Sequence, residues 1–366
     1  MSTWPSESQK QRQPTATSEA RLHELRSQAE RKGRVEHVGV HPEGAPFPRA
    51  SVETGYYGIP LLKQPPWTWE IPLYFAVGGA AGAAAVIAAL ADWIADDDKL
   101  AQDARWIAVG GAALSSVLLI SDLGRPKRFL GMLRVFKLQS PMSVGAWTLT
   151  AFGSAAGAAT FAKLLRSRYD WLPIRIVGEI SQGMAALLGL PLHNYTGVLI
   201  GASAVPVWNK NVKTLPVHFG MSGLQAGVSV LELMGNENAA LNWLGILASA
   251  FESWEGFNIE SDSNRVLTPL KRGRSGFLTR AGGVLSGPTP LLLRLAAVFS
   301  KNSDSLRKLA ACCGIAGSVL TRYAWMSAGR ASTKDWRLPL EVEDKRPQEK
   351  PLPARMVEAV REPRRA

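Results

Sequence analysis

Long apolar segments separated by short polar ones make up the central part of the chain. Each is close to the roughly 20 residues that a helix needs to cross the hydrocarbon core of a membrane. There are eight such segments: 70–93, 105–121, 143–164, 180–208, 213–234, 239–258, 282–299 and 306–325. The pattern predicts an all-α polytopic membrane protein with eight transmembrane helices.

Two of these segments are less regular than the others. The fourth contains Pro191, which a membrane helix tolerates when neighbouring groups satisfy the freed carbonyl, and it could begin as early as Ile174. The seventh contains two prolines and Arg294. A shorter or re-entrant seventh segment, and thus seven crossings, is the alternative.

The two ends of the chain differ from its centre. Residues 1–66 and 327–366 are rich in Arg, Lys, Glu, Gln and Pro, and they carry too little apolar surface to offset the entropy of ordering. We therefore expect a basic, mostly polar N-terminal tail at 1–66, a membrane domain at 67–326 and a polar C-terminal tail at 327–366. Because the first 30 residues contain no apolar stretch typical of a signal peptide, the first membrane helix is expected to direct insertion.

Eight crossings place both termini on one side of the membrane, which we call the N face. The loops expected there, 122–142, 209–213 and 259–281, hold twelve Lys and Arg, against nine in the opposite loops, 94–105, 163–175, 235–238 and 300–308. Loop charge is therefore nearly even, and only the basic tails favour a cytoplasmic N face.

Ionisable residues in or beside the apolar segments gather toward the N face. They are Glu70, Asp122, His218, Glu252 and Glu255. Such groups are costly in a membrane and usually mark a ligand site or a proton route, although any one of them could simply cap a helix or reach the headgroups.

Glycines spaced four residues apart occur in four of the segments. The pairs are Gly78 and Gly82, Gly153 and Gly157, Gly197 and Gly201, and Gly223 and Gly227. Because this spacing puts two small residues on one helix face, where backbones can approach closely, it predicts a compact bundle.

The loop "SDLGRPKRFLGMLRVFKLQSPMS" is unusually basic for a segment between two membrane helices. In this loop, Asp122 could cap a helix or pair with Arg125 and Arg128. The pattern predicts an amphipathic interfacial helix over 126–137, with Phe129 and Phe136 on its apolar side. We prefer a docking role for this loop, and a solvated loop that binds anionic lipid is the alternative.

This loop and the residues after it, "SDLGRPKRFLGMLRVFKLQSPMSVGAWTL", resemble the signature of the NrfD/PsrC family, the membrane subunits of polysulfide-reductase-like complexes. The stretches "WTWEIPLYFAVGGAAGA", "YTGVLIGASAVPVW" and "LPVHFGMSGLQAG" are similar to the family's first, fourth and fifth spans. The resemblance covers about residues 55–325.

The resemblance implies eight helices arranged as two four-helix bundles in the bacterial inner membrane, with menaquinone or ubiquinone bound near one face. Electrons would pass between the quinone and a peripheral iron–sulfur subunit, often with a molybdopterin catalytic subunit beyond it. It implies no haem or iron–sulfur cluster in this subunit, and we expect no nucleic-acid partner. The sequence has no CxxC motif, and its only cysteines, Cys312 and Cys313, are interpreted as small apolar side chains.

By the same resemblance, the Tyr195 hydroxyl bonds a quinone oxygen, and Glu70 occupies a polar position of the site. Trp67 and Trp69 are either site walls or interfacial belt residues, and His193 is a lesser candidate on another helix face. The remaining candidates, Asp122, Arg125, His218, Glu252 and Glu255, are expected to form a proton route or a partner-facing surface.

The expected depth of Tyr195 in the membrane conflicts with a quinone site that also contains Glu70. Because Tyr195 precedes Trp208 by 13 residues, a helix ending at 208 would put it about 20 Å below the N face, far from Glu70.

Two other functions fit the same pattern: an ion or solute transporter, and a structural membrane anchor for a soluble enzyme. The sequence does not specify the electron donor, the acceptor or the direction of electron flow.

Overall fold

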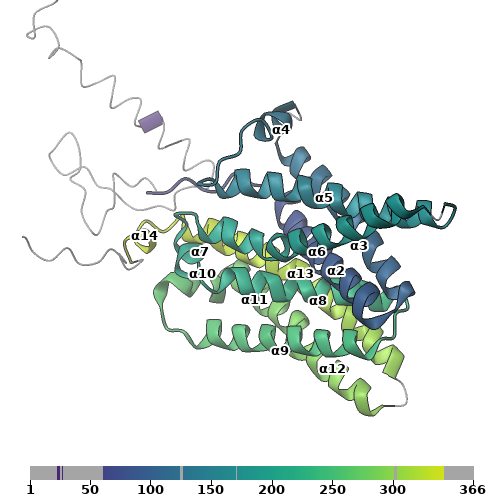
Figure 1. Cartoon of the computed structure of the whole chain (residues 1–366). Helices are drawn as coiled ribbons and strands as arrows, with labels where there is room; N and C mark the ends of the chain where they lie inside the picture. The colour runs from purple at the N-terminus through teal and green to yellow at the C-terminus, as the bar shows by residue number, and fades with distance from the viewer. Residues whose placement is uncertain are drawn as a thin grey trace, which may run out of the picture.

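The computed structural model describes residues 61–123, 127–169, 171–300 and 303–341, together with residues 23, 24 and 27. Within these ranges the chain is helical and contains no strand (Figure 1). The long helices are α2 (Glu70–Leu90, continued by the π-helix η2, Ala91–Ala95), α3 (Asp98–Asp122), α5 (Pro141–Arg166), α6 (Leu172–Gly201), α8 (Leu215–Leu233), α9 (Ala239–Ser261), α11 (Gly273–Ser286), α12 (Pro288–Phe299) and α13 (Ser303–Ser332). The short ones are α4 (Lys127–Met132), α7 (Pro206–Lys210), the 3-10 helix η3 (Arg265–Leu267), α10 (Thr268–Lys271) and α14 (Leu338–Glu341).

Helix is present in all eight of the predicted segments. In the described part of the chain, four helical stretches are long and apolar enough to cross a membrane: Glu70–Ala95, Asp98–Asp122, Leu172–Gly201 and Gly273–Phe299. The all-α prediction is thus confirmed for the described residues, whereas the number of crossings stays a prediction.

The helices pack as two groups of neighbours. Helices α2, α3, α5 and α6 contact one another, as do α8, α9, α11, α12 and α13. Helices α2 and α6 join the groups, because both contact α8, and α2 also contacts α13. Helix α4 lies at the edge of the first group in Figure 1. This is the arrangement that two bundles would give, although the expected two four-helix bundles in a membrane stay a prediction.

Glycine permits the closest crossings of α2. A Cβ at Gly82 would lie 2.6 Å from the carbonyl oxygen of Gly189 in α6, so neither position can carry a side chain without moving a helix. The Gly153 and Gly157 pair behaves differently: a Cβ at Gly153 would make only ordinary contact with Ala112, and one at Gly157 would meet no atom within 4 Å. This pair therefore does not mark a close approach between two helix backbones.

Two predicted helix boundaries are also wrong. Helix α6 ends at Gly201 instead of 208, because the chain turns there and Pro206 begins the separate helix α7. The predicted interfacial helix over 126–137 is helical only to Met132, and Phe136 beyond it is 52% exposed. Arg125 lies outside the described residues.

Candidate functional site

A cavity lies among α2, α3, α5 and α6, near the end where α2 begins. The lining residues are mostly apolar or aromatic: Trp67, Ile71, Tyr74, Phe75, Leu119, Asp122, Leu123, Met132, Met142, Gly145, Ala146, Tyr195 and Leu199. The cavity therefore offers a flat apolar ligand a slot with a few polar groups at its walls.

Tyr195 reaches this cavity because α6 ends early. It precedes Gly201 by six residues, which places it about 9 Å from the end of the helix. Its side chain is largely buried, and its hydroxyl donates a hydrogen bond to the Pro141 carbonyl oxygen over 2.5 Å. The ring fits against α5 only because Gly145 has no side chain, since a Cβ there would overlap the tyrosine ring.

Two carboxylates lie beside the rim of the cavity, joined by Thr68. One oxygen of Asp122 accepts hydrogen bonds from the Thr68 backbone N–H at 3.1 Å and from its hydroxyl at 2.8 Å. The same hydroxyl is also within hydrogen-bonding distance of the Glu70 carboxylate, and its single proton can be donated to only one of the two carboxylates at a time. Asp122 lines the cavity, whereas Glu70 does not line it and is connected to Asp122 through Thr68. The 20 Å separation expected from the sequence is therefore wrong.

Of the other quinone-site residues predicted from the sequence, only Trp67 lines the cavity. Trp67 lines the cavity and stacks on Trp208, with ring centroids 5.8 Å apart. Trp69 is 60% exposed and does not line the cavity. His193 faces away from the cavity toward α2 and α8, where its Nδ1 lies 2.6 Å from the Leu190 carbonyl oxygen and its Nε2 lies next to Gly220.

His218, Glu252 and Glu255 form a separate buried cluster between α8 and α9. His218 Nδ1 lies 3.6 Å from Glu252 Oε1, and the other Glu252 oxygen accepts a hydrogen bond from Ser286 at 2.8 Å. Neither ring nitrogen of His218 has a hydrogen-bond partner among the residues that the structure describes. This cluster therefore retains capacity to bind or relay a proton.

Aromatic side chains connect the cavity with this cluster. Phe75 lines the cavity, and its ring centroid is 6.2 Å from that of Phe219, which in turn is 6.0 Å from His218. The fully buried Arg322, which the sequence analysis missed, covers the Phe219 ring at 4.2 Å and donates to the Phe219 carbonyl oxygen. The cavity and the cluster are thus neighbouring but distinct sites.

A buried ion pair near the other end of α8 was also missed. Arg294 Nη1 lies 2.7 Å from Glu232 Oε1, and both side chains are almost completely buried. Gly245 of α9 provides the space, because a Cβ there would approach Arg294 Nε to 2.5 Å. A signal was present in the sequence, since opposite charges occur in the fifth and seventh apolar segments, but Arg294 was interpreted only as a weakness of the seventh.

No group of three or more His, Cys, Asp and Glu side chains is placed to hold a metal ion among the residues that the structure describes. The polar groups on the cavity walls, Tyr195 and Asp122, can take part in hydrogen bonding and proton exchange.

Comparison with known proteins agrees with the motifs. Residues 61–236 match the family model described as "Polysulphide reductase, NrfD". The sequence is also 26% identical over 187 residues to the C subunit of the polysulfide reductase of Wolinella succinogenes, a match covering 46% of this protein and 58% of the relative. The cavity residues and His218 fall inside the family match, whereas Glu252 and Glu255 lie beyond it. Residues 61–236 are therefore similar to the polysulphide reductase NrfD family, as the motifs predict, and this similarity together with the apolar helices indicates an integral membrane protein.

Proposed function

We propose that this chain is the quinone-binding membrane subunit of a respiratory oxidoreductase complex in the bacterial inner membrane. The observation that carries the proposal is the apolar, aromatic cavity, with Tyr195 and Asp122 on its walls. A quinone needs an apolar slot and hydrogen-bond partners for its two oxygens, and it needs no catalytic nucleophile. Menaquinone and ubiquinone share both requirements.

The bond from Tyr195 to Pro141 defines what the tyrosine offers a ligand. While the hydroxyl donates its proton to that carbonyl, its oxygen can still accept a hydrogen bond, as from the O–H of a quinol. To donate to a quinone carbonyl, the hydroxyl must leave Pro141. Asp122 would serve as the proton acceptor at the rim, with Glu70 behind it.

A basic groove suggests where the electron partner docks. Its lining holds six cations and one acid: Arg265, Lys271, Arg272, Arg274, Arg330, Lys334 and Asp335. Arg330 also donates to the carbonyl of Trp67, which lines the cavity. We propose that an acidic surface of an iron–sulfur subunit covers this groove, with a molybdopterin subunit beyond it, because electrons must pass close to the quinone.

The His218, Glu252 and Glu255 cluster is the proposed proton route. It is buried, it keeps unpartnered polar atoms, and it adjoins the cavity through Phe219. Protons exchanged by the quinone would reach this cluster through water molecules that pass beside Phe75 and Phe219, because an aromatic ring does not itself relay a proton.

Alanine at Gly145 should impair the quinone site selectively. The added methyl group would overlap the Tyr195 ring, and overpacking of this kind costs about 1–3 kcal/mol. We expect quinone-linked turnover to fall while turnover of the partner with a soluble dye is unchanged. Gly157→Ala is the control on the same helix, because its Cβ meets nothing within 4 Å. Equal turnover in the two variants would contradict the placement of Tyr195.

The proposed topology has eight crossings, with both termini on the N face. Reporter fusions at residue 1 and residue 366 should give the same location, since an even number of crossings returns the chain to its starting side. Opposite locations would eliminate the eight-helix arrangement.

Removal of this subunit from the complex tests the proposed function itself. Turnover of the soluble partner with a dye should persist, whereas electron exchange with quinone in the membrane should disappear. Restoring the subunit with a disrupted cavity should restore membrane attachment without quinone activity. If that variant supports full quinone activity, the subunit is only an anchor, and if solute uptake is lost instead, it is a transporter.

A further inference from the structure

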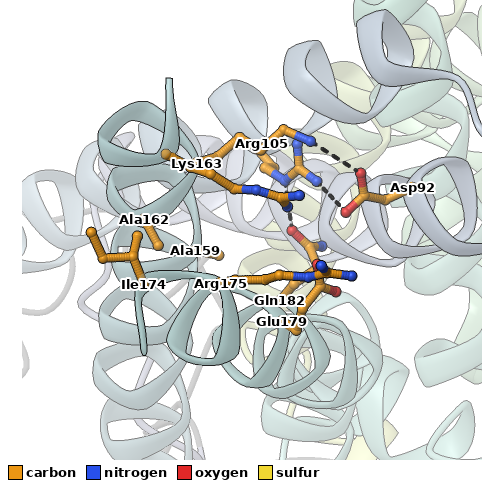
Figure 2. A pocket seen from close by; sticks show the side chains of 11 residues that line it. Asp92, Arg105, Ala159, Ala162, Lys163, Ile174, Arg175, Glu179 and Gln182 are labelled. Carbon is orange, nitrogen blue, oxygen red and sulfur yellow. Dashed lines mark hydrogen bonds and ion pairs between the residues drawn. The ribbon is translucent and has the colours of Figure 1, made fainter. Parts of the chain in front are cut away.

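A charged pocket lies at the opposite end of the helices from the quinone cavity, among α2, α3, α5 and α6 (Figure 2). Its ionisable lining consists of four cations and two acids: Arg105, Lys163, Arg166, Arg175, Asp92 and Glu179. Four positive charges minus two negative charges leave a net charge of +2. The cations come from the second turn of α3, the first turn of α6 and the last turn of α5, so the pocket lies near the ends of these helices.

The acids do not satisfy all of these cations. Asp92 pairs with Arg105 at 2.5 Å and with Lys163 at 3.5 Å, as Figure 2 shows, and Lys163 also contacts Asp98 outside the lining. Glu179 accepts a hydrogen bond from Trp93.

Three arginine side chains of the pocket keep nitrogen atoms that can bind a ligand. Arg105 is 4% exposed, and its Nη1 is buried without a hydrogen-bond partner, although its Nε donates to Gln182. Arg166 and Arg175 form no side-chain hydrogen bond or ion pair with any residue that the structure describes. A buried, partly unpartnered guanidinium flanked by two free ones is suited to an anion with several oxygens.

The surroundings of the pocket are those of a membrane–water boundary. Four aromatic residues around it are 47–66% exposed: Trp93, Trp106, Tyr169 and Trp171. Tryptophan and tyrosine are enriched at the level of the lipid headgroups. Near these same helix ends, α5 and α6 expose large apolar side chains: Phe161, Leu164, Ile176, Val177 and Ile180.

We propose that this pocket binds the phosphate group of an anionic phospholipid. Arg105, Arg166 and Arg175 hold the phosphate, while the acyl chains lie along the exposed apolar faces of α5 and α6. A free phosphate ion would use the same cations, but it would leave these apolar faces without a role. The inference is independent of the quinone proposal, because none of these residues lines the quinone cavity.

Lipid binding to the purified full-length protein, together with any subunits that copurify, tests the proposal. Native mass spectrometry would measure the affinity for phosphatidylglycerol and phosphatidylcholine, with and without excess inorganic phosphate. The variants are Arg166→Gln and Arg175→Gln, since neither change leaves a buried acid unpaired. Arg168→Gln is the matched control, because Arg168 is exposed in the same loop and does not line the pocket.

We expect phosphatidylglycerol to bind more tightly than phosphatidylcholine and to resist displacement by phosphate. Each pocket variant should weaken its binding about fivefold, and the double variant about 30-fold, with Arg168→Gln close to the unmodified protein. Equal affinity for the two lipids, or equal binding by the double variant, would overturn the site. Displacement of the lipid by inorganic phosphate would overturn the lipid as its occupant and leave a free anion instead.

Discussion

Replacing Arg294 with methionine will destabilise the protein by about 3–5 kcal/mol, because it leaves Glu232 buried without its partner. Methionine fills much of the same space, so the loss comes mainly from the uncompensated charge. Chemical unfolding of the purified protein in detergent measures the effect. The double variant Arg294→Met with Glu232→Leu should recover most of the stability, because a buried pair replaced by apolar residues is often neutral.

A second ion pair provides the control for this prediction. Arg280 on α11 contacts Glu260 at 2.6 Å, but both side chains are more than half exposed. Arg280→Met should therefore change stability little. If Arg294→Met is as mild as Arg280→Met, Glu232 is protonated or hydrated, and the buried ion pair does not exist as described.

Removing the hydroxyl of Tyr195 should reduce quinone-linked turnover about 5- to 150-fold, because a bound quinone or quinol loses its hydrogen-bond partner. This reduction corresponds to a loss of about 1–3 kcal/mol. The assay compares quinone-linked turnover of the whole complex in membranes with turnover using a soluble dye. Dye-linked turnover should be unchanged in Tyr195→Phe. Tyr169→Phe is the control, because Tyr169 is exposed and lies outside the cavity.

Glu70→Gln tests the second member of the same proposed site. Glu70 reaches the cavity through Thr68 and Asp122, so its effect should be smaller than that of Tyr195→Phe. If both variants assemble normally and keep unchanged quinone kinetics, the cavity is not the quinone site. His218 and Glu255 would then be the next candidates.

Much of the fold was predictable because each long helix is an apolar segment with polar ends. The end of α6 was not, because the residues after Gly201, "ASAVPVW", are as apolar as the helix itself. Hydropathy cannot separate a membrane helix from a buried turn followed by a short helix. Because α6 was expected to end at 208 instead of Gly201, the predicted depth of Tyr195 below the N face was too large.

The candidate site was predictable where residues are close along one helix. His193 and Tyr195 were expected on different faces of their helix, and the structure places only Tyr195 in the cavity. The Glu232 and Arg294 pair was not found, because the opposite charges of the two apolar segments become a pair only through helix packing, which the sequence does not show. Arg322 was missed for the same reason: its contact with Phe219 depends on the packing of α13 against α8.

Photoaffinity labelling with a photoreactive quinone analogue tests the central claim most directly. In membranes that contain the whole complex, the label should appear on peptides that line the cavity, around Trp67–Phe75, Met142–Ala146 and Tyr195–Leu199. An excess of natural quinone should prevent this labelling, and Tyr195→Phe should weaken it. Labelling confined to α8, α9 or α13, or labelling that natural quinone does not displace, would contradict a quinone site in this cavity.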